Sequence, residues 1–365
     1  MITLDGNCVV DASIDGSELL SSLTPASFRS LKILERSGVI LPVFELTLLQ
    51  AGFQLVKDLR KVNSKIKLSY GVSKDTLRTY TYNILNYNSV SSNGQQLFTL
   101  TGVLDVPEFT NVPRIQFIEG TSDQVFNKIS SLKPEVNYSG GDNQIWIQHN
   151  NSDKNFVERV LAHSFVSDNN CILGAITSDS QLIITSLKDA FSSNEAKYNI
   201  GISGQNAIKP IGISVESDSA LWSSFLSEGR SLSILNVEDR SIDHFSSSPV
   251  SVVDNSSNSG VLENVAYPLQ LNNGNCHDNY YQAYINNLNY STQLLRNCVY
   301  VTTSSYLPND ELKLHDLLNY MTSDKSLNST VDAMSGTYIL MEKVMSFSDR
   351  SFTQRLKLCR DFLLE

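Results

Sequence analysis

The residues best suited to chemistry in this chain stand next to one another at Cys276-His277-Asp278. A cysteine, a histidine and an aspartate are the residue types of a nucleophile, its general base and an orienting acid. Consecutive side chains diverge, however, whereas the members of a catalytic triad come together from separate segments of the fold. We therefore interpret this tripeptide as loop or packing residues, and the sequence predicts no catalytic residue here.

A metal site is the second use that these residue types allow. Cys276, His277 and Cys298 are of zinc-ligand type, but they lack the Cys-x-x-Cys spacing of structural zinc sites. His149 and His163 flank a predicted helix, where a hydrogen-bonded structural histidine is the expected role. We therefore predict no metal ligand.

Paired carboxylates are the remaining candidates, because glycoside cleavage uses two acids at a fixed separation. The acids here are scattered over polar, loop-like segments; examples are Glu216, Asp218, Glu238 and Asp239. Gly201-Ile202-Ser203-Gly204 is one residue short of the Gly-x-Ser-x-Gly nucleophile motif, and no glycine-rich phosphate loop occurs. We expect a protein with no catalytic activity and no bound cofactor.

Size, charge and cysteine usage exclude several classes of protein. The 365 residues suffice for a substantial core and for about two to four compact units. A net charge of −10 without clustered Lys and Arg argues against specific nucleic-acid binding. Five cysteines without close pairing are typical of reduced or buried thiols in a protein made in the cytoplasm. We find no secretory signal and no run of about 18 apolar residues, so no integral membrane segment is expected.

Residues 1–112 are predicted to be mostly β-strand. Polar and apolar residues alternate in four runs, which are separated by turn residues such as Ser91-Ser92-Asn93-Gly94. The runs are Phe44–Leu48, Lys65–Tyr70, Tyr80–Tyr87 and Leu97–Thr101. A small antiparallel barrel or sandwich is the simplest arrangement, with a short helix or covering loop over residues 51–62.

Near residue 113 the spacing of the apolar residues changes from that of a strand to that of a helix, which marks the start of a second unit. Thr121 and Gln124 have the spacing of a capping box, and Pro134 is expected to end the helix that follows. The apolar face of that helix carries Val125, Phe126, Ile129 and Leu132. A second helix is predicted to start at Ser152 or Asp153. With a strand at Ile145–Ile147 and a hairpin over Cys171–Leu187, these helices form a compact α+β unit.

The strand and the second helix of this unit are expected to share one core. Its predicted members are Ile145, Ile147, Phe156, Val157, Val160 and Leu161. Trp146 and Trp222 are the only tryptophans, and a tryptophan on an alternating strand is expected in the core with its N–H bonded to backbone. Anchoring of a subunit interface is the alternative role for these two rings.

From about residue 199 the sequence returns to strand patterns. A Ser/Asn/Pro-rich connection occupies residues 246–260, and a helix is predicted over Tyr280–Leu295. Further strands are predicted at Val299–Thr302, Ser335–Leu340 and Arg355–Asp361. The last of them is expected to pair back onto the strands of 200–250.

Two of these segments, Thr121–Leu187 and Ser335–Asp361, carry a resemblance to a known family, with weaker support from Pro42–Leu48 and Gly102–Leu104. The order of these segments and their residue patterns resemble those of tail hub proteins: the baseplate hub of contractile-tailed bacteriophages and its relatives in the late-control protein D and VgrG groups. The hub pattern has a Gly-Asp turn in the last barrel. This chain has Leu312–Asp316 in its approximate place.

The resemblance implies a β-rich α+β fold with two tube-like antiparallel β-barrels and a small central α+β domain. The first barrel would occupy residues 1–112 and the α+β domain residues 113–198. The second barrel would start in 199–254 and end in 299–365, and 255–298 would be an insertion or linking segment.

The resemblance also implies a function. It is that of a virion structural protein without catalysis, a homotrimeric tail or baseplate hub that adapts the hexameric tail tube to a trimeric spike. The implied partners are further copies of the chain, the tail tube protein, the spike protein and other baseplate proteins. The implied location is the virion tail, with the host cytoplasm during assembly. A hub of a contractile secretion or bacteriocin particle has the same pattern, and the alternative from another class is a tail-associated cell-wall hydrolase or carbohydrate-binding module.

Overall fold

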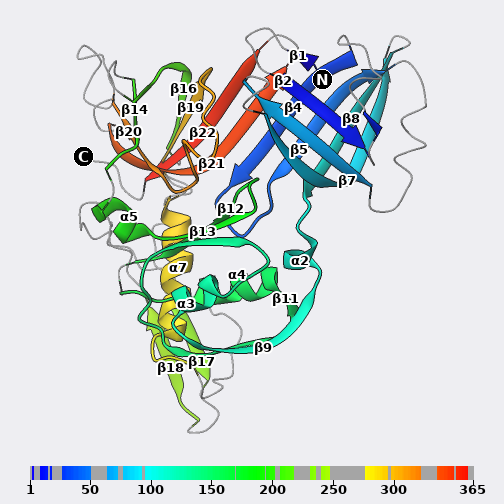
Figure 1. Cartoon of the computed structure of the whole chain (residues 1–365). Helices are drawn as coiled ribbons and strands as arrows, with labels where there is room; N and C mark the ends of the chain where they lie inside the picture. The colour runs from blue at the N-terminus through cyan, green and yellow to red at the C-terminus, as the bar shows by residue number, and fades with distance from the viewer. Residues whose placement is uncertain are drawn as a thin grey trace.

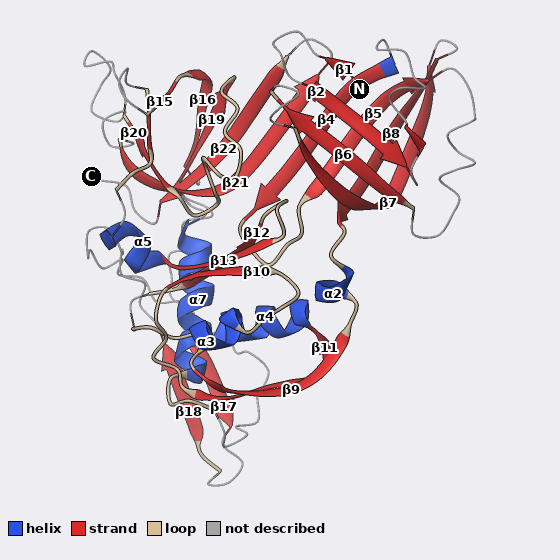
Figure 2. Ribbon diagram, viewed as in Figure 1, coloured by secondary structure: helices blue, strands red, loops and turns tan. Residues whose placement is uncertain are grey.

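The fold of the chain is β-rich α+β, with long strands and a few short helices (Figure 2). A computed structural model describes residues 2–3, 9–14, 17–18, 27–50, 64–72, 77–92, 95–168, 170–193, 195–201, 206–217, 231–235, 240–246, 276–294, 297–321, 335–348 and 351–360. Within these ranges, the largest sheet contains 15 strands and three smaller sheets accompany it. No helix in the described ranges is long and apolar enough to cross a membrane.

The first strands of the chain form one antiparallel assembly at one end of the molecule (Figure 1). Its strands pair in the order β2, β6, β7, β8, β5, β4. Their bounds are β2 Val9–Ile14, β4 Phe28–Arg36, β5 Val43–Gln50, β6 Lys65–Gly71, β7 Arg78–Ser92 and β8 Gln95–Leu104, and the short strands β1 (Ile2–Thr3) and β3 (Ser17–Glu18) flank β2. All four strands predicted from alternation are confirmed, whereas β2 and β4 were not predicted. The helix or loop predicted over 51–62 lies outside the described residues.

The α+β unit lies below this assembly and contains most of the helices (Figure 1). Its elements are α2 (Pro107–Thr110), β9 (Pro113–Gly120), α3 (Ser122–Asn127), β10 (Lys133–Asn137), β11 (Gln144–Ser152), α4 (Asp153–His163), β12 (Ile172–Ile176), β13 (Gln181–Ser186) and α5 (Leu187–Ser193). β9 pairs with β11, and β10, β13 and β12 form a second sheet. The predicted hairpin over Cys171–Leu187 is confirmed as the antiparallel pair β12–β13.

The helix boundaries follow the capping signals in part. Ser152 caps α4, because its hydroxyl accepts a hydrogen bond from the N–H of Asn155 at 3.4 Å. Thr121 stands at the start of α3, but its side chain makes no cap hydrogen bond. The prediction that Pro134 ends this helix is wrong, because α3 has already ended at Asn127 and Pro134 is part of strand β10. A proline near the beginning of a strand costs the sheet little stability, since no ladder hydrogen bond needs its missing N–H there.

The predicted core of the α+β unit is correct for its helix and wrong for its strand. Phe156, Val157 and Val160 are fully buried, and Leu161 packs against the same core. Ile145 and Ile147, in contrast, are 51% and 39% exposed. Successive side chains of a strand point to opposite faces, and the inward face of β11 is the one that carries Trp146.

The last part of the chain forms a second group of strands. Their bounds are β14 Tyr198–Ile200, β15 Ala207–Ile208, β16 Pro210–Ser217, β19 Asn297–Thr303, β20 Leu317–Tyr320, β21 Gly336–Ser348 and β22 Phe352–Arg360. The predicted strands at 299–302, 335–340 and 355–361 correspond to β19, β21 and β22, and residue 361 lies outside the described residues. β22 pairs with β19, which pairs in turn with β16.

One hairpin within 199–254, which the sequence assigned to a second barrel, belongs to neither large assembly. β17 (Ser231–Leu235) and β18 (Ile242–Ser246) pair only with each other in the described residues and pack against α7 (Tyr280–Leu294). The helix α7 confirms the prediction for Tyr280–Leu295 and contacts α4 of the α+β unit. Residues 247–275, with the predicted loop, lie outside the described part of the chain.

Strand β21 joins the two β assemblies, as Figure 1 shows between β4 and β20. Its first residues, Gly336–Ile339, pair with β20, and its later residues, Glu342–Ser348, pair with β4 of the first assembly. The register shifts between Leu340 and Glu342, where the strand passes from one partner to the other. Strand β21 is therefore hydrogen-bonded to strands of both assemblies.

Candidate functional site

The motif Cys276-His277-Asp278 precedes α7 and takes part in packing. The Nε2–H of His277 donates to the carbonyl of His163 at 3.0 Å, and its backbone N–H donates to Gln144 Oε1 at 3.0 Å. The ring of His163 stacks on Tyr280 with centroids 3.7 Å apart. Burial lowers the pKa of His163 to about 4 and also lowers the pKa of His277, so both rings are neutral at pH 7. These contacts fasten α7 to α4.

Cys298 lies in another part of the structure, away from the two residues with which a zinc site was considered. It stands opposite Cys359 in the β19–β22 pair, with 3.2 Å between the two Sγ atoms. The hydrogen bond with Cys298, together with burial, raises the pKa of Cys359 well above its usual value. Among the described residues, no group of three or more His, Cys, Asp or Glu side chains is placed to hold a metal ion.

The remaining sequence candidates divide into those that the structure describes and those that it does not. Trp146 is 2% exposed and its Nε1–H donates to the carbonyl of Gly120 at 3.0 Å, which confirms the predicted core role. Trp222, Asp218, Glu238 and Asp239 lie outside the described residues, as does most of Gly201-Ile202-Ser203-Gly204. The side chain of Glu216 is likewise not described.

An exposed apolar surface covers the outer side of the β9–β11 pair. We call it the β9–β11 face, and it consists of Ile115, Phe117, Ile145 and Ile147, which are 66%, 69%, 51% and 39% exposed. Phe117 lies directly opposite Ile147 in the ladder, so the four side chains form one contiguous patch. A contiguous exposed patch of large apolar residues is typical of a protein interaction surface.

A second exposed apolar surface lies on the first β assembly. We call it the β7–β8 face, and it consists of Val90 and Leu97, which are 53% and 37% exposed. Val90 and Leu97 are directly opposite each other in the β7–β8 pair. The chain therefore presents two separate apolar surfaces, on two different units.

A buried ion pair lies where the two β assemblies and the α+β unit meet. The Nζ of Lys343, on β21, is 3.5 Å from Oε2 of Glu35, on β4, and both side chains are 0% exposed. Glu35 Oε1 accepts hydrogen bonds from the N–H of Ser178 at 2.7 Å and from Asn309 Nδ2 at 3.0 Å. Lys343 Nζ also donates to the carbonyl of Leu312 at 3.0 Å. One charge pair thus connects four segments that are far apart in the sequence.

The surroundings of Glu35 favour its ionised form. Burial alone would raise the pKa of Glu35, but the Lys343 ammonium and the hydrogen bonds from Ser178 and Asn309 lower it below its usual value. Tyr80 strengthens the same junction, because its hydroxyl donates to Asp179 Oδ1 at 2.7 Å. Buried charges persist when they are paired and hydrogen-bonded in this way.

This ion pair was not predicted from the sequence. Glu35 follows the inward-facing Leu31 and Ile33 in the alternation of β4, and Lys343 precedes the inward-facing Met345 and Phe347 in β21. The sequence signal for each of them is a charged residue at a position where the alternation of the strand predicts a buried apolar side chain. Its partner could not be found without the pairing of β4 with β21.

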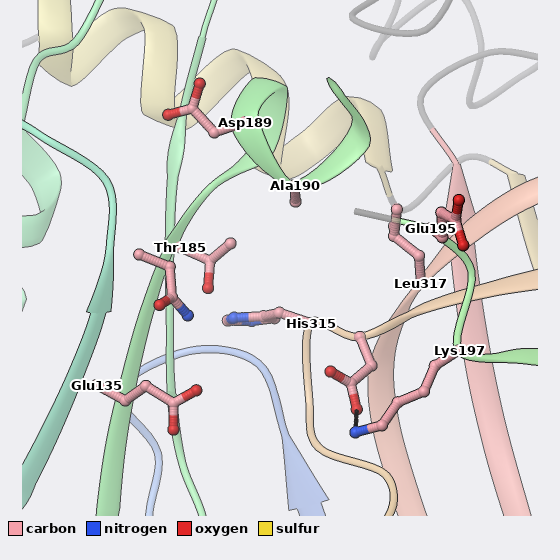
Figure 3. A pocket seen from close by; sticks show the side chains of 10 residues that line it. Glu135, Thr185, Asp189, Ala190, Glu195, Lys197, His315 and Leu317 are labelled. Atoms are coloured by element: carbon pink, nitrogen blue, oxygen red, sulfur yellow. Dashed lines mark hydrogen bonds and ion pairs between the residues drawn. The ribbon is translucent and has the colours of Figure 1, made fainter. Parts of the chain in front are cut away.

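A polar cleft of about 520 Å³ opens next to this junction (Figure 3). It lies between the β10–β13 sheet with α5 and the segments that carry Lys197 and His315. The residues around it include Glu135, Thr185, Asp189, Glu195 and Leu317. Figure 3 shows the His315 ring projecting into the space between them.

Comparison with known proteins finds similarity in structure only. No protein-family model and no curated protein matches the sequence. The structure is similar to that of a tail protein from Neisseria meningitidis MC58, with 10% identity, 97% of each chain covered and a TM-score of 0.59. It is also similar to the 43 kDa tail protein of prophage MuSo2 from Shewanella oneidensis, with 10% identity, 96% of each chain covered and a TM-score of 0.56.

The chain has the fold of phage tail proteins. Nearly the whole of each chain takes part in both alignments, so the tail-protein fold extends over both β assemblies and the α+β unit. The resemblance that the sequence carries in Thr121–Leu187 and Ser335–Asp361 is confirmed as a likeness of fold. At 10% identity this likeness concerns the fold alone.

Proposed function

We propose that this chain is a structural protein of a phage-type virion tail, and that it acts as a baseplate hub. The observation that carries the proposal is the alignment of almost the entire chain with two tail proteins, with no part of either left to form a separate enzyme domain. In the proposed particle the chain contacts the tail tube, the spike and other baseplate proteins. It is made in the host cytoplasm before assembly.

The proposed assembly is a homotrimer. A closed ring with threefold symmetry needs a heterologous interface, in which one surface of each copy meets a different surface of the next. The β9–β11 face and the β7–β8 face supply two distinct apolar surfaces on one chain. Burying them between copies would remove large apolar side chains from water at about 25 cal/mol per Å².

The domain division predicted from the sequence is part of this proposal. The first barrel would be 1–112 and the α+β domain 113–198; the second barrel would start in 199–254 and end in 299–365, with 255–298 as an insertion or linking segment. Strand β21 would hold the two barrels at a fixed angle, as a ring of paired barrels requires. The hairpin β17–β18 and α7 would serve as an attachment to the α+β domain.

The oligomeric mass of the purified chain tests the trimer. Native mass spectrometry and sedimentation should give a mass near three copies, either alone or after addition of the spike protein. Phe117→Ser should shift the mass towards the monomer, whereas Lys154→Ser, at a partly exposed position of α4, should leave it unchanged. A dimer or tetramer in the assembled particle would contradict the hub proposal.

The absence of catalysis is tested separately. A turbidity assay on purified peptidoglycan should show no clearing by the chain at concentrations at which a known muramidase clears it completely. Clearing would favour the alternative, a tail-associated cell-wall hydrolase.

A further inference from the structure

Two cysteines face each other near one end of the β19–β22 ladder. Cys298 and Cys359 are directly opposite in the register, and their Sγ atoms are 3.2 Å apart. Both are thiols in the structure. Opposite residues of an antiparallel pair have Cα atoms about 4.5–5.5 Å apart, within the range of about 4.4–6.8 Å that a disulfide accepts. Only the two sulfur atoms therefore have to approach for a bond to form, to about 2.05 Å.

The surroundings of the two sulfur atoms are apolar. Cys298 and Cys359 are 2% and 0% exposed and belong to one cluster with Leu294, Ile339 and Met341. The Cys298 thiol donates to the Leu294 carbonyl at 4.0 Å, and a thiol is a weak donor. Replacing two S–H groups by one S–S bond therefore costs little hydrogen bonding and leaves no charge in the cluster.

The position of the pair in the ladder provides a route for a reagent. In the described residues, the β19–β22 ladder has one further pair beyond the two cysteines, Asn297 with Arg360. On the other side of β22, the ladder with β21 ends at the pair of Ile339 with Cys359. Opening of a strand end costs less free energy than unfolding of the whole protein. Local opening at this end therefore brings Cys359 into contact with solvent while the rest of the fold persists.

The environment of Cys359 differs between the closed and the opened ladder. In the closed ladder, the hydrogen bond with Cys298 and burial hold the pKa of Cys359 well above its usual value, so the reactive thiolate is scarce. The nearby ammonium of Lys357 acts in the opposite direction and favours the thiolate. Opening removes the hydrogen bond and the burial. The thiols are therefore protected in the closed ladder and become reactive when its end opens.

We propose that Cys298 and Cys359 are a redox-sensitive pair, which closes as a cross-strand disulfide when the chain meets a low-molecular-weight disulfide such as oxidised glutathione. One cysteine thiolate attacks a sulfur of oxidised glutathione, breaks its S–S bond and releases one glutathione thiolate. As the ladder closes, the second cysteine attacks the mixed disulfide and releases the second glutathione. Two electrons pass from the cysteines to glutathione, and the two released thiolates take up the two thiol protons.

The disulfide cross-links the second group of strands. It joins β19 to β22, and β22 pairs with β21, which is hydrogen-bonded to both assemblies. The two cysteines are 61 positions apart, so the bond restricts a long loop of the unfolded chain and stabilises the folded state. In a reducing cytoplasm the pair stays reduced. The additional stability therefore arises only in an oxidising environment.

The experiment oxidises the full chain in a buffer of oxidised and reduced glutathione. One sample is the native protein, and the other refolds from urea in the same buffer, so that every thiol meets the reagent. Remaining thiols are blocked with iodoacetamide in denaturant, and peptide mass spectrometry without reduction identifies each disulfide. Five cysteines allow ten different pairs. We expect one predominant disulfide in both samples, between Cys298 and Cys359.

Urea unfolding measures the effect of the bond. The midpoint of the oxidised chain should be higher than that of the reduced chain by about 0.5–1 M urea. The control Cys276→Ser removes the half-buried cysteine and should leave the disulfide and the midpoint shift in place. Cys359→Ala and Cys298→Ala should each abolish both. Each variant is compared with its own reduced form, so a loss of stability from the substitution itself does not affect the comparison.

Three results would overturn this inference. They are a predominant disulfide between any other two cysteines, recovery of Cys298 and Cys359 as alkylated thiols from the refolded sample, and equal midpoints for the oxidised and reduced wild type. All measurements use the chain alone. Their outcome is therefore separate from whether the chain forms a trimeric hub.

Discussion

Glu35 and Lys343 form a fully buried ion pair between strands of the two β assemblies, with 3.5 Å between Oε2 and Nζ. Glu35 also accepts hydrogen bonds from Ser178 of the α+β unit and from Asn309. Because the pair is enclosed by all three parts of the fold, loss of either charge leaves the other one buried and uncompensated.

The first prediction concerns this pair. Lys343→Met should lower the free energy of unfolding by about 3–5 kcal/mol, because it leaves the buried carboxyl group of Glu35 without its counter-charge. The double variant Glu35→Gln/Lys343→Met should recover much of that loss. Denaturant unfolding at pH 7 measures both. Lys32→Met is the control, since Lys32 forms an ion pair of 2.8 Å with Glu45 on the exposed surface, and it should cost about 0–1 kcal/mol.

The second prediction concerns pH. In the unfolded chain, a histidine takes up a proton below about pH 6.5, but the folded chain keeps His163 neutral until about pH 4. The unfolded state therefore binds more protons between these values, and stability falls as the pH falls from 6.5 to 4, by up to about 3 kcal/mol. His163→Phe, which keeps a ring on Tyr280, should remove this part of the pH dependence. The control His149→Gln, at an exposed position of β11, should leave this pH dependence in place. If stability falls equally steeply with pH in wild type and His163→Phe, the prediction is contradicted.

The third prediction compares two phenylalanines of the α+β unit. Phe156 is fully buried and Phe117 is 69% exposed. Phe156→Ala should cost about 3–5 kcal/mol, because it leaves a cavity in the core. Phe117→Ala should change the stability of the monomer by no more than about 0.5 kcal/mol. Unfolding at low protein concentration distinguishes them, and a wild-type midpoint for Phe156→Ala would show that the core assignment is wrong.

The fourth prediction concerns the cysteines. The thiolate is the reactive form of cysteine, and Cys359 has a raised pKa and no exposure beside the buried Cys298. A short pulse of iodoacetamide on the native protein should label the half-buried Cys276 before it labels Cys298 or Cys359. Peptide mass spectrometry reads the order. In denaturant all three should react at similar rates, which shows that the protection belongs to the fold.

Much of the local structure could be predicted from the sequence because it depends on neighbouring residues. Alternation identified β5, β6, β7 and β8, and the serine cap identified the start of α4. The same local signals predicted the β12–β13 hairpin, since a hairpin pairs residues that are close in the chain. The residue patterns of two short segments were enough to predict the tail-protein fold, which the structural comparison then confirmed.

Tertiary structure alone decided which face of a strand is buried and which distant residues meet. Alternation in β11 offered two faces, and packing against α4 selected the one with Trp146, so that Ile145 and Ile147 face outwards. Likewise, Glu35 and Lys343 are 308 positions apart, and no local rule relates them. They meet because β21 pairs with β4, and pairing between distant strands depends on the packing of the whole chain.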